Sequence, residues 1–303
     1  MNVLSLFDGM SCGRIALERA GIQVDNYYAS EIDKYAITIA KKNYPDTQHI
    51  GDVTQVNAAD LPQIDLLIGG SPCQGFSFAG KQLNFDDPRS ALFFEYVRLL
   101  KETKPTYFLL ENVRMKKQFK DVITSYLGVE PIMINSALLS AQNRVRFYWT
   151  NIPNVTVPDD KGIVLKDIIE CGAVDRDKSH CLDANYFKGG NLKSYFEKHR
   201  RQLVFSNDRL CREPKILQIP HGYNKGGLKE NKSPSMTTSS WQHNNHLTYD
   251  EGLTYRKLSP IECERLQTVP ENYTEGVSNT QRYKMLGNGW TVDVIAHILK
   301  SIK

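Results

Sequence analysis

The chain has 303 residues, of which 41% are hydrophobic and 24% are charged, and its formal net charge is +4. This composition is typical of a globular protein that is long enough for one large core and a smaller second domain. The longest apolar runs are far shorter than a membrane span, and the N-terminus lacks a basic-then-apolar leader. We therefore expect a soluble, cytoplasmic protein with no membrane partner.

Short β-like runs alternate with helical patterns through the first half of the chain. Strands are expected at 3–7, 26–30, 64–68, 106–110, 132–134 and 146–149, and helices at 13–20, 33–43 and 91–102. Strands that alternate with helices indicate βαβ units. The predicted fold class is therefore α/β, with a mostly parallel, doubly wound, Rossmann-like sheet.

The periodicity fades after about residue 170, and this region predicts a smaller, irregular domain of loops and short strands. Between Asp175 and Asp250 there are 13 Lys/Arg against 8 Asp/Glu, together with five of the seven histidines. Such a charge excess is either a solvated surface or a basic face for a polyanion such as DNA. Charge alone leaves both interpretations open.

Helical order returns near the C-terminus. Ser259 followed by Pro260 indicates an N-cap with proline at the first helical position, and it predicts a helix through Gln267. A last helix is expected over residues 292–302.

The six cysteines are scattered without a C-x-x-C pair, which argues against a zinc knuckle and against a disulfide scaffold. They are Cys12, Cys73, Cys171, Cys181, Cys211 and Cys263. Cys73 differs from the others, because it lies in LIGGSPCQGFS on a rigid turn at the mouth of a predicted strand. This position is typical of a presented nucleophile, although a lone structural cysteine is the alternative.

Acidic residues follow three successive predicted strands. The first strand runs into the glycine-punctuated turn from Phe7 to Gly13, which contains Asp8. Glu31 ends the second strand, and Asp52, in Gly51-Asp52-Val53, lies in the next expected strand-end position. Open parallel sheets bind ligands at the C-terminal ends of their strands, so three acids there favour a nucleoside ligand. Each acid alone could be a helix cap, and the turn lacks the G-x-G-x-x-G spacing of a nicotinamide site.

Two further motifs place charge beside predicted strands. Glu111 closes the apolar strand that ends at Leu110, where burial would favour its protonated form; alternatively it caps the following helix. Arg144 and Arg146 are two positions apart in QNRVR, so they lie on one face of a strand. They are either surface charges or converge on a base and a phosphate.

Together these motifs resemble the C5-cytosine DNA methyltransferase family, in the expected order and over nearly the whole chain. FDGxxxG is similar to the family's S-adenosylmethionine turn, SPCQ to its nucleophile loop, ENV to its acid and QNRVR to its Q-x-R-x-R element. Residues 256–267 resemble its late R-x-L-x-P-x-E-x-x-R-L-Q block, and GNGWTV at 287–292 resembles its closing G-N-x-x-x-V element. Six ordered matches are a highly specific signal.

The resemblance implies a DNA (cytosine-5-)-methyltransferase that acts on a flipped-out cytosine in duplex DNA, with S-adenosylmethionine as cofactor and no metal. Cys73 would add to C6 and Glu111 would protonate N3. Arg144 would hold the base carbonyl, and Arg146 would steady the site. Further substrate contacts are implied for Pro72, Gln74, Asn112 and Gln142.

The resemblance also implies the cofactor contacts and the domain boundaries. Phe7 would stack on the adenine, and Asn288 and Trp290 would close over the methionine end. The complete implied cofactor set is Phe7, Asp8, Gly9, Cys12, Gly13, Glu31, Ile32, Asp52, Val53, Asn288 and Trp290. Residues 1–170 would form the catalytic domain, 171–250 the target-recognition domain, and 251–303 a return segment that completes the catalytic domain.

Some details point to particular branches of the family. Ser71 and Trp290 resemble the animal de novo enzymes, whereas Gln74 and the compact length resemble bacterial or phage enzymes, which would place the protein at the nucleoid of a bacterial or phage-infected cell. A tRNA methyltransferase is the nearest alternative, but its Cys-Phe-Thr tripeptide is absent. A catalytically inactive accessory subunit is the other alternative, although it should have lost Cys73 or Glu111. The target sequence, the oligomeric state and the existence of a cognate restriction endonuclease stay open.

Overall fold

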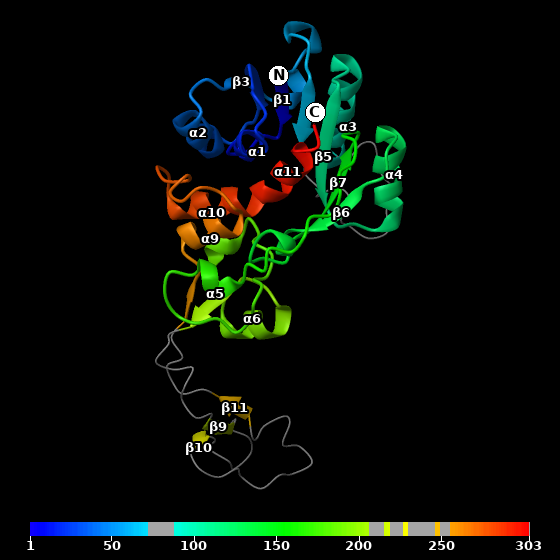
Figure 1. Cartoon of the computed structure of the whole chain (residues 1–303). Helices are drawn as coiled ribbons and strands as arrows, with labels where there is room; N and C mark the ends of the chain where they lie inside the picture. Colours follow the sequence, from blue (N-terminus) through cyan, green and yellow to red (C-terminus); the bar gives the residue numbers. More distant parts are fainter. Residues whose placement is uncertain (72–87, 206–214, 219–226, 230–245, 249–254, 303) are drawn as a thin grey trace.

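The computed structural model describes residues 1–71, 88–205, 215–218, 227–229, 246–248 and 255–302. Its centre is a seven-stranded sheet with the strand order β3-β2-β1-β4-β5-β7-β6 (Figure 1). The strands are β1 (Asn2–Leu6), β2 (Asn26–Ser30), β3 (Gln48–Gly51), β4 (Leu66–Gly69), β5 (Tyr107–Val113), β6 (Ile132–Asn135) and β7 (Val145–Thr150). Strands β1 to β5 are parallel, and β7 runs antiparallel between β5 and β6. The mostly parallel α/β sheet predicted from the sequence is confirmed.

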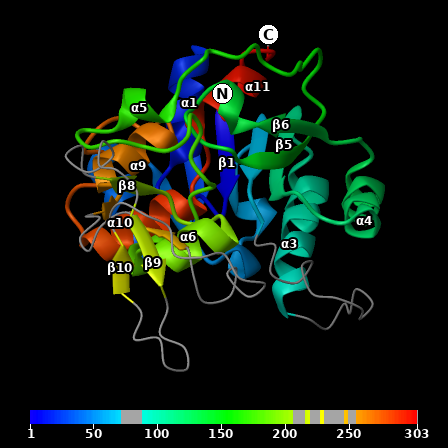
Figure 2. The same ribbon diagram turned by 90° about the horizontal axis from the view of Figure 1, so that it is seen from below.

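Helices cover both faces of this sheet, because both faces of its strands are apolar. In β1, Val3 faces one hydrophobic cluster, whereas Leu4 and Leu6 face the other. Helices α1 (Cys12–Ala20) and α11 (Val292–Leu299) pack in the first cluster, and α3 (Pro88–Thr103) and α4 (Lys117–Leu127) in the second. Figure 2 shows the two pairs of helices around the central strands. Helix α2 (Lys34–Asn43) connects β2 to β3.

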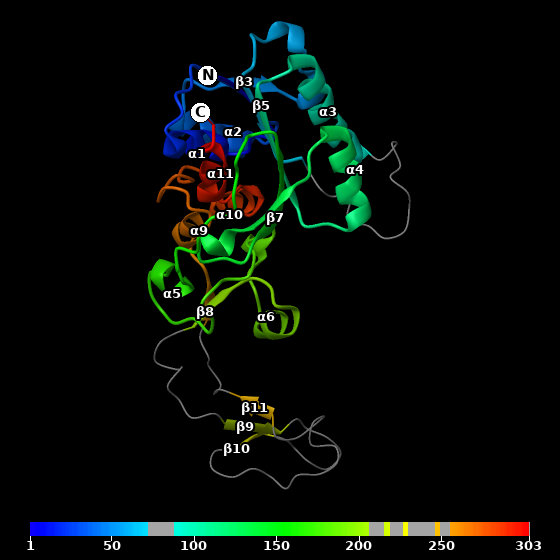
Figure 3. The same ribbon diagram turned by 45° about the vertical axis from the view of Figure 1, so that its right-hand side comes forward.

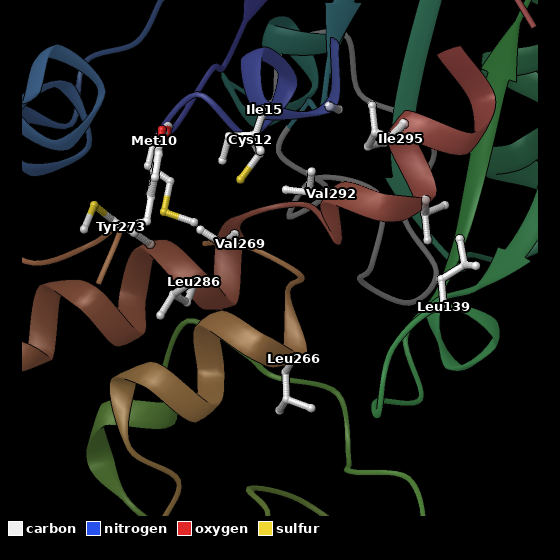
Figure 4. Close-up of a cluster of buried hydrophobic side chains, with 14 of the residues drawn as sticks. Met10, Cys12, Ile15, Leu139, Leu266, Val269, Tyr273, Leu286, Val292 and Ile295 are labelled. Atoms are coloured by element: carbon white, nitrogen blue, oxygen red, sulfur yellow. The ribbon is translucent and has the colours of Figure 1, made fainter. Parts of the chain in front are cut away.

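The C-terminal return segment packs against the start of the chain. It contains α9 (Pro260–Leu266), α10 (Asn279–Asn288) and α11. Figure 4 shows Met10 and Cys12 beside side chains of this segment, including Val292. The predicted N-cap is confirmed, since Ser259 accepts a hydrogen bond from the backbone of Glu262 in a capping box.

Three features of this sheet and its helices were not predicted from the sequence. Helix α4 has its buried side chains at Phe119, Ile123 and Leu127, a spacing that a longer window would have identified. Helix α10 has too few apolar residues for a clear periodicity. Strand β5 extends to Val113, so Glu111 lies inside the strand rather than after its end.

The described residues between 151 and 254 form short helices and strands, and Figure 3 shows these elements below the sheet; a smaller irregular domain is predicted from about residue 170. These elements include α5 (Leu165–Ile168), α6 (Leu192–Lys198), β8 (Leu203–Phe205) and a three-stranded sheet of β9 (Lys215–Gln218), β10 (Gly227–Lys229) and β11 (His246–Thr248). Strand β8 pairs antiparallel with β12 (Tyr255–Lys257), and Ala173 forms an isolated bridge with Phe205 of β8. Four 3-10 turns complete the described elements: η1 (Val53–Gln55), η2 (Ala58–Asp60), η3 (Ser136–Leu138) and η4 (Tyr186–Lys188). Among the described residues, no helix is long and apolar enough to span a membrane.

Candidate functional site

A cavity of about 510 Å³ opens where the parallel strands end. Its wall includes the segments that follow β1, β2, β3 and β4, and the last residues of β5. The strand order reverses direction between β1 and β4, and open α/β sheets bind ligands at such a point. The residues predicted from the sequence that line it are Phe7, Asp8, Gly9, Cys12, Glu31, Ile32, Asp52, Val53, Glu111, Asn112, Arg144, Arg146, Asn288 and Trp290.

Of the predicted site residues that the structure describes, Gly13 and Gln142 do not line the cavity. Pro72, Cys73 and Gln74 lie outside the described residues. Gln142 is fully buried, and its side chain donates hydrogen bonds to backbone and side-chain oxygens of the α9 C-terminus. A Cβ atom at Gly13 would lie 2.5 Å from a side-chain carbon of the sheet, so the glycine allows α1 to pack closely on β4.

The loop after β1 has an unusual backbone. Phe7, Gly9 and Ser11 all have positive φ angles, of 57°, 61° and 64°. Only glycine adopts this region without strain, so two of the three positions are costly unless the surroundings enforce them. The hydroxyl of Ser11 does not cap α1, because it donates a hydrogen bond to Asp8 instead. Cys12, the first residue of α1, lines the cavity.

The carboxylate of Asp8 holds this loop from the protein side. It accepts hydrogen bonds from the hydroxyls of Ser5 at 2.6 Å, Ser11 at 2.6 Å and Tyr27 at 2.7 Å. Burial raises the pKa of Asp8 above its ordinary value, and the three hydroxyl donors offset only part of that effect. The hydrogen bonds of Asp8 are thus made to the protein, and its carboxylate stabilises the loop that forms this wall of the cavity.

Glu31 ties the loop after β1 to the loop after β2. One of its oxygens accepts a 2.8 Å hydrogen bond from the backbone of Gly9, and the other accepts 2.8 Å bonds from Ile32 and Asp33. Each carboxylate oxygen has two lone pairs, so the oxygen that binds Gly9 can still accept one further donor. Beside it, Ile32 is 74% exposed, which is unusual for a large apolar side chain next to a cavity.

Asp52, which follows β3, caps a short helix and also lines the cavity. Its Oδ1 atom accepts a 3.0 Å hydrogen bond from the backbone of Thr54 and so caps the short helix η1, while the residue also lines the cavity. From the sequence, Asp52 is either a helix cap or a ligand-binding residue. In the structure it caps η1 and also lines the cavity, so the two roles do not exclude each other.

Glu111 and Arg146 form an ion pair at the opposite end of the cavity. Arg146 Nε lies 2.8 Å from Glu111 Oε1, but its N–H does not point at that oxygen, so the contact is not an aligned hydrogen bond. A Cβ atom at Gly70 would lie 3.1 Å from Glu111 Oε2 and 2.9 Å from Trp290 Nε1. Glycine at the end of β4 is thus what allows the acid and the indole to approach each other.

Arg144 is in a different environment from Arg146. Only 4% of its surface is exposed, and its guanidinium donates to the backbone carbonyls of Leu182, Gly287 and Gly289. These donors are therefore already used within the protein. Arg146 is instead held by an ion pair with Glu111, and the roles expected of the two arginines toward a base stay predictions.

The described cysteines differ in their reactivity. Burial raises the pKa of the Cys12 thiol to about 12 and raises that of Cys263 well above its usual range, so both are unreactive at neutral pH. Cys181 is exposed, and its sulfur lies 3.4 Å from a guanidinium nitrogen of Arg144 and 4.0 Å from one of Arg146. Cys181 does not itself line the cavity, whereas Cys12 does.

The sequence analysis missed Lys284 and Asp33 on the cavity wall. Lys284 Nζ donates to Asp33 Oδ2 at 2.8 Å, which joins α10 to the first turn of α2 across 251 residues. The residue could have been found only if α10 had been predicted. The ionisable residues of the wall are Asp8, Glu31, Asp33, Asp52 and Glu111 against Arg144, Arg146 and Lys284. This acidic excess suits a cationic ligand, and among the described residues no cluster could hold a metal ion.

Comparisons with known proteins agree with this architecture. The family model of the C-5 cytosine-specific DNA methylases matches residues 1–303. The type II methyltransferase M1.ScrFI of Lactococcus lactis subsp. cremoris is 30% identical over 99% of this chain and 77% of its own length. The type II methyltransferase M.HhaI of Haemophilus parahaemolyticus is 28% identical over 100% of this chain and 94% of its own length.

Solved structures share the fold at low sequence identity. A Spodoptera frugiperda DNMT2 mutant superimposes with a TM-score of 0.69 at 19% identity, over 99% of this chain and 98% of that chain. A putative DNA modification methyltransferase from an Escherichia coli prophage gives a TM-score of 0.63 at 21% identity, over 100% and 98% of the two chains. These similarities concern the fold alone.

Proposed function

This chain belongs to the C-5 cytosine-specific DNA methylase family, and on that premise we propose that it methylates C5 of a cytosine flipped out of duplex DNA, using S-adenosylmethionine. One observation carries the proposal. The acidic rim formed by Glu31 and Asp52 and the ion pair of Glu111 with Arg146 line one and the same cavity. A donor site and an acceptor site that share a cavity can bring a methyl group and a base together.

The cofactor end of the cavity fits a nucleoside with a positive charge. Glu31 and Asp52 would accept hydrogen bonds from ribose and adenine, and the exposed Ile32 would cover one face of the adenine, opposite Phe7. The first turn of α1 opens on the cavity at Cys12, and helix N-termini attract carboxylates. Asn288 and Trp290 would close that methionine end. When bound, S-adenosylmethionine supplies the methyl group.

The base end of the cavity would bind cytosine by its polar edge. Arg146 would donate to the base carbonyl, and Glu111 would give its proton to N3. Both side chains line the cavity, and Arg146 Nε lies 2.8 Å from Glu111 Oε1, so one base could contact both groups.

Cys73 would be the nucleophile. Its thiolate adds to C6, Glu111 donates a proton to N3, and the electron pair of the resulting enamine makes C5 reactive toward the methyl group. Loss of the C5 proton to solvent and departure of the Cys73 thiolate then restore the C5–C6 double bond, and the N3 proton returns to Glu111. Ser71, two residues before the cysteine, is held by Asn112, whose side chain donates to its carbonyl at 3.3 Å and its hydroxyl at 3.2 Å. Asn112 would thereby fix the start of the nucleophile segment next to Glu111.

The domain division follows from the same proposal. Residues 1–170 and 251–303 would form the catalytic domain, and 171–250, with its basic excess, would bind the DNA. Ala173 and Tyr255 both pair with Phe205, which supports an insertion whose two ends are adjacent. The relatives include type II enzymes and the orphan methyltransferase M.Rho11sI of Bacillus phage rho11s, so this chain would act either with a cognate restriction endonuclease or without one.

The test is transfer of a tritiated methyl group from S-adenosylmethionine to nucleic acid. We expect label in duplex DNA and none in tRNA, with 5-methylcytosine as the only labelled base. Label in tRNA alone would make the tRNA enzyme the correct alternative. No label in either, with DNA binding retained, would make the chain an accessory subunit.

A further inference from the structure

The guanidinium of Arg144 joins segments that are far apart in the chain. Its Nη1 atom donates to the carbonyl of Leu182 at 2.9 Å, and its Nη2 atom donates to the carbonyls of Gly289 at 2.9 Å and Gly287 at 3.3 Å. Arg144 itself precedes β7. The nearest of these partners along the chain is 38 residues away and the farthest is 145.

The partners of Arg144 belong to two different functional regions. Gly287 and Gly289 flank Asn288, and residues 287–290 line the cofactor cavity. Leu182 lies in the segment assigned above to DNA recognition. The two regions also touch directly, because a Cβ atom at Gly287 would lie 2.2 to 2.4 Å from backbone atoms of residues 183 and 184.

The nature of these contacts favours mechanical coupling over simple packing. A guanidinium is a rigid planar fork with five donors, so it fixes the relative positions of the carbonyls it binds. Besides the sulfur of Cys181, the three acceptors of Arg144 are backbone carbonyls, which cannot turn away without moving the chain itself. The site is buried, so water cannot replace a missing donor. A shift of residues 287–289 would therefore carry Leu182 with it.

We propose that Arg144 is a positioning residue that couples cofactor binding to DNA binding, and this inference rests on the proposed function. A ligand bound in the cavity restricts the movement of residues 287–290. Through the hydrogen bonds of Arg144, residues 181–183 are then restricted as well. The recognition segment is thereby held in the conformation that binds DNA. Coupling between two ligands is reciprocal, so DNA must tighten cofactor binding by the same factor.

The test measures this factor with S-adenosylhomocysteine, which lacks the methyl group and cannot turn over. Affinity for a short duplex that carries the site methylated in the tritium assay is measured with and without the compound, by fluorescence anisotropy. Calorimetry gives the reciprocal quantity, which is the affinity for S-adenosylhomocysteine with and without the duplex. For the unchanged protein we expect each ligand to tighten the other by about tenfold, within the usual range of such couplings.

Arg144→Lys keeps the charge but has fewer donors and no planar fork. We expect the coupling factor to fall to about twofold or less. The matched control is Arg265→Lys, because Arg265 also donates to a backbone carbonyl, that of Ile168, but does not line the cavity. This control should keep the full factor. A merely structural Arg144 would instead lower the melting temperature and both affinities and leave their ratio unchanged.

Gly287→Ala provides a second variant that leaves Arg144 intact. Its new Cβ must push residues 183 and 184 away, so it should also reduce the coupling factor. Independent binding of the two ligands in the unchanged protein would overturn the inference, and so would an unchanged factor in both Arg144→Lys and Gly287→Ala. Failure of the unchanged protein to bind S-adenosylhomocysteine at all would instead overturn the proposed function.

Discussion

The two ends of the cavity are built on different principles. At the cofactor end, Glu31 accepts three backbone hydrogen bonds and Asp52 caps η1, so both carboxylates are held before any ligand arrives. At the base end, Glu111 and Arg146 share one poorly aligned ion pair. The carboxylates of the first arrangement are preorganised. In the second, the side chains share only an ion pair, and a bound base would add hydrogen bonds to them.

This difference predicts how each end responds to mutation. Changes at the cofactor end should alter affinity, because they disturb a structure that exists without the ligand. Changes at the base end should alter the rate of the chemical step, because the interactions there become complete only during the reaction. The following predictions test that division, beginning with the largest expected effect.

Cys73→Ala should abolish methyl transfer and leave S-adenosylmethionine affinity unchanged, because the nucleophile belongs to the base end. With a duplex in which 5-fluorocytosine replaces the target base, the unchanged protein should form an adduct that survives denaturing electrophoresis. The fluorine at C5 cannot leave as a proton, so the cysteine cannot be released. The adduct should map to the peptide that contains Cys73.

Cys181→Ala is the matched control for this experiment, since Cys181 is exposed and contacts both arginines of the site. It should form the adduct normally. An adduct that persists in Cys73→Ala and disappears in Cys181→Ala would transfer the nucleophile to Cys181 and overturn the proposed mechanism.

Glu111→Gln should slow the single-turnover rate by about 10²- to 10⁴-fold, the usual contribution of a general acid. An amide keeps the shape of the side chain but cannot deliver a proton to N3. Rapid-quench measurement of methyl transfer gives the rate, and calorimetry should show an unchanged affinity for S-adenosylmethionine. A loss of affinity that equals the loss of rate would mean that Glu111 belongs to the cofactor end.

Glu31→Ala should weaken S-adenosylmethionine binding by about 1–3 kcal/mol, the cost of leaving buried donors unpaired, and change the single-turnover rate at saturation only slightly. Calorimetry measures the first quantity and rapid quench the second. Unchanged affinity would reduce Glu31 to a turn-forming residue without a ligand contact.

The exposed lysines of α6 should contribute to DNA affinity, and each should have a smaller effect than the changes above. Replacing Lys193 and Lys198 by alanine should reduce the slope of log K against log salt by about 0.9 for each phosphate that the protein no longer neutralises, and leave cofactor affinity unchanged. Lys117→Ala on α4 is the control, because Lys117 is 85% exposed but lies outside the proposed recognition domain. An equal effect of all three changes would argue against DNA binding by α6.

The smallest effect is expected at Asp8, and it depends on pH. The folded state raises the pKa of this acid, so between its ordinary value of 3.8 and the raised value the folded protein holds a proton that the unfolded chain has released. The free energy of unfolding that comes from Asp8 must therefore fall as the pH rises through that window. Asp8→Asn removes this titration, so urea unfolding should show the variant gaining stability relative to the unchanged protein as the pH rises. A constant difference between the two proteins would show that Asp8 has its ordinary pKa.

The sequence by itself determined the sheet, the order of its motifs and most of the cavity wall. Short apolar runs such as that of β1, the capping box at Ser259 and the acids after successive strands are local patterns, so they can be read without knowledge of the tertiary structure. That is why Glu31, Asp52 and Glu111 could be assigned to one edge of the sheet before their distances were known.

Only the tertiary structure decided what the two arginines of QNRVR do. Their spacing gives both the same face of a strand, but the spacing does not specify which acceptors each guanidinium meets. Arg144 meets carbonyls from residues 182, 287 and 289, whereas Arg146 meets Glu111. The contact of Lys284 with Asp33 was likewise not evident from the sequence. Such contacts depend on where distant backbone segments come to lie, and that is fixed by the packing of the whole chain rather than by any short stretch of it.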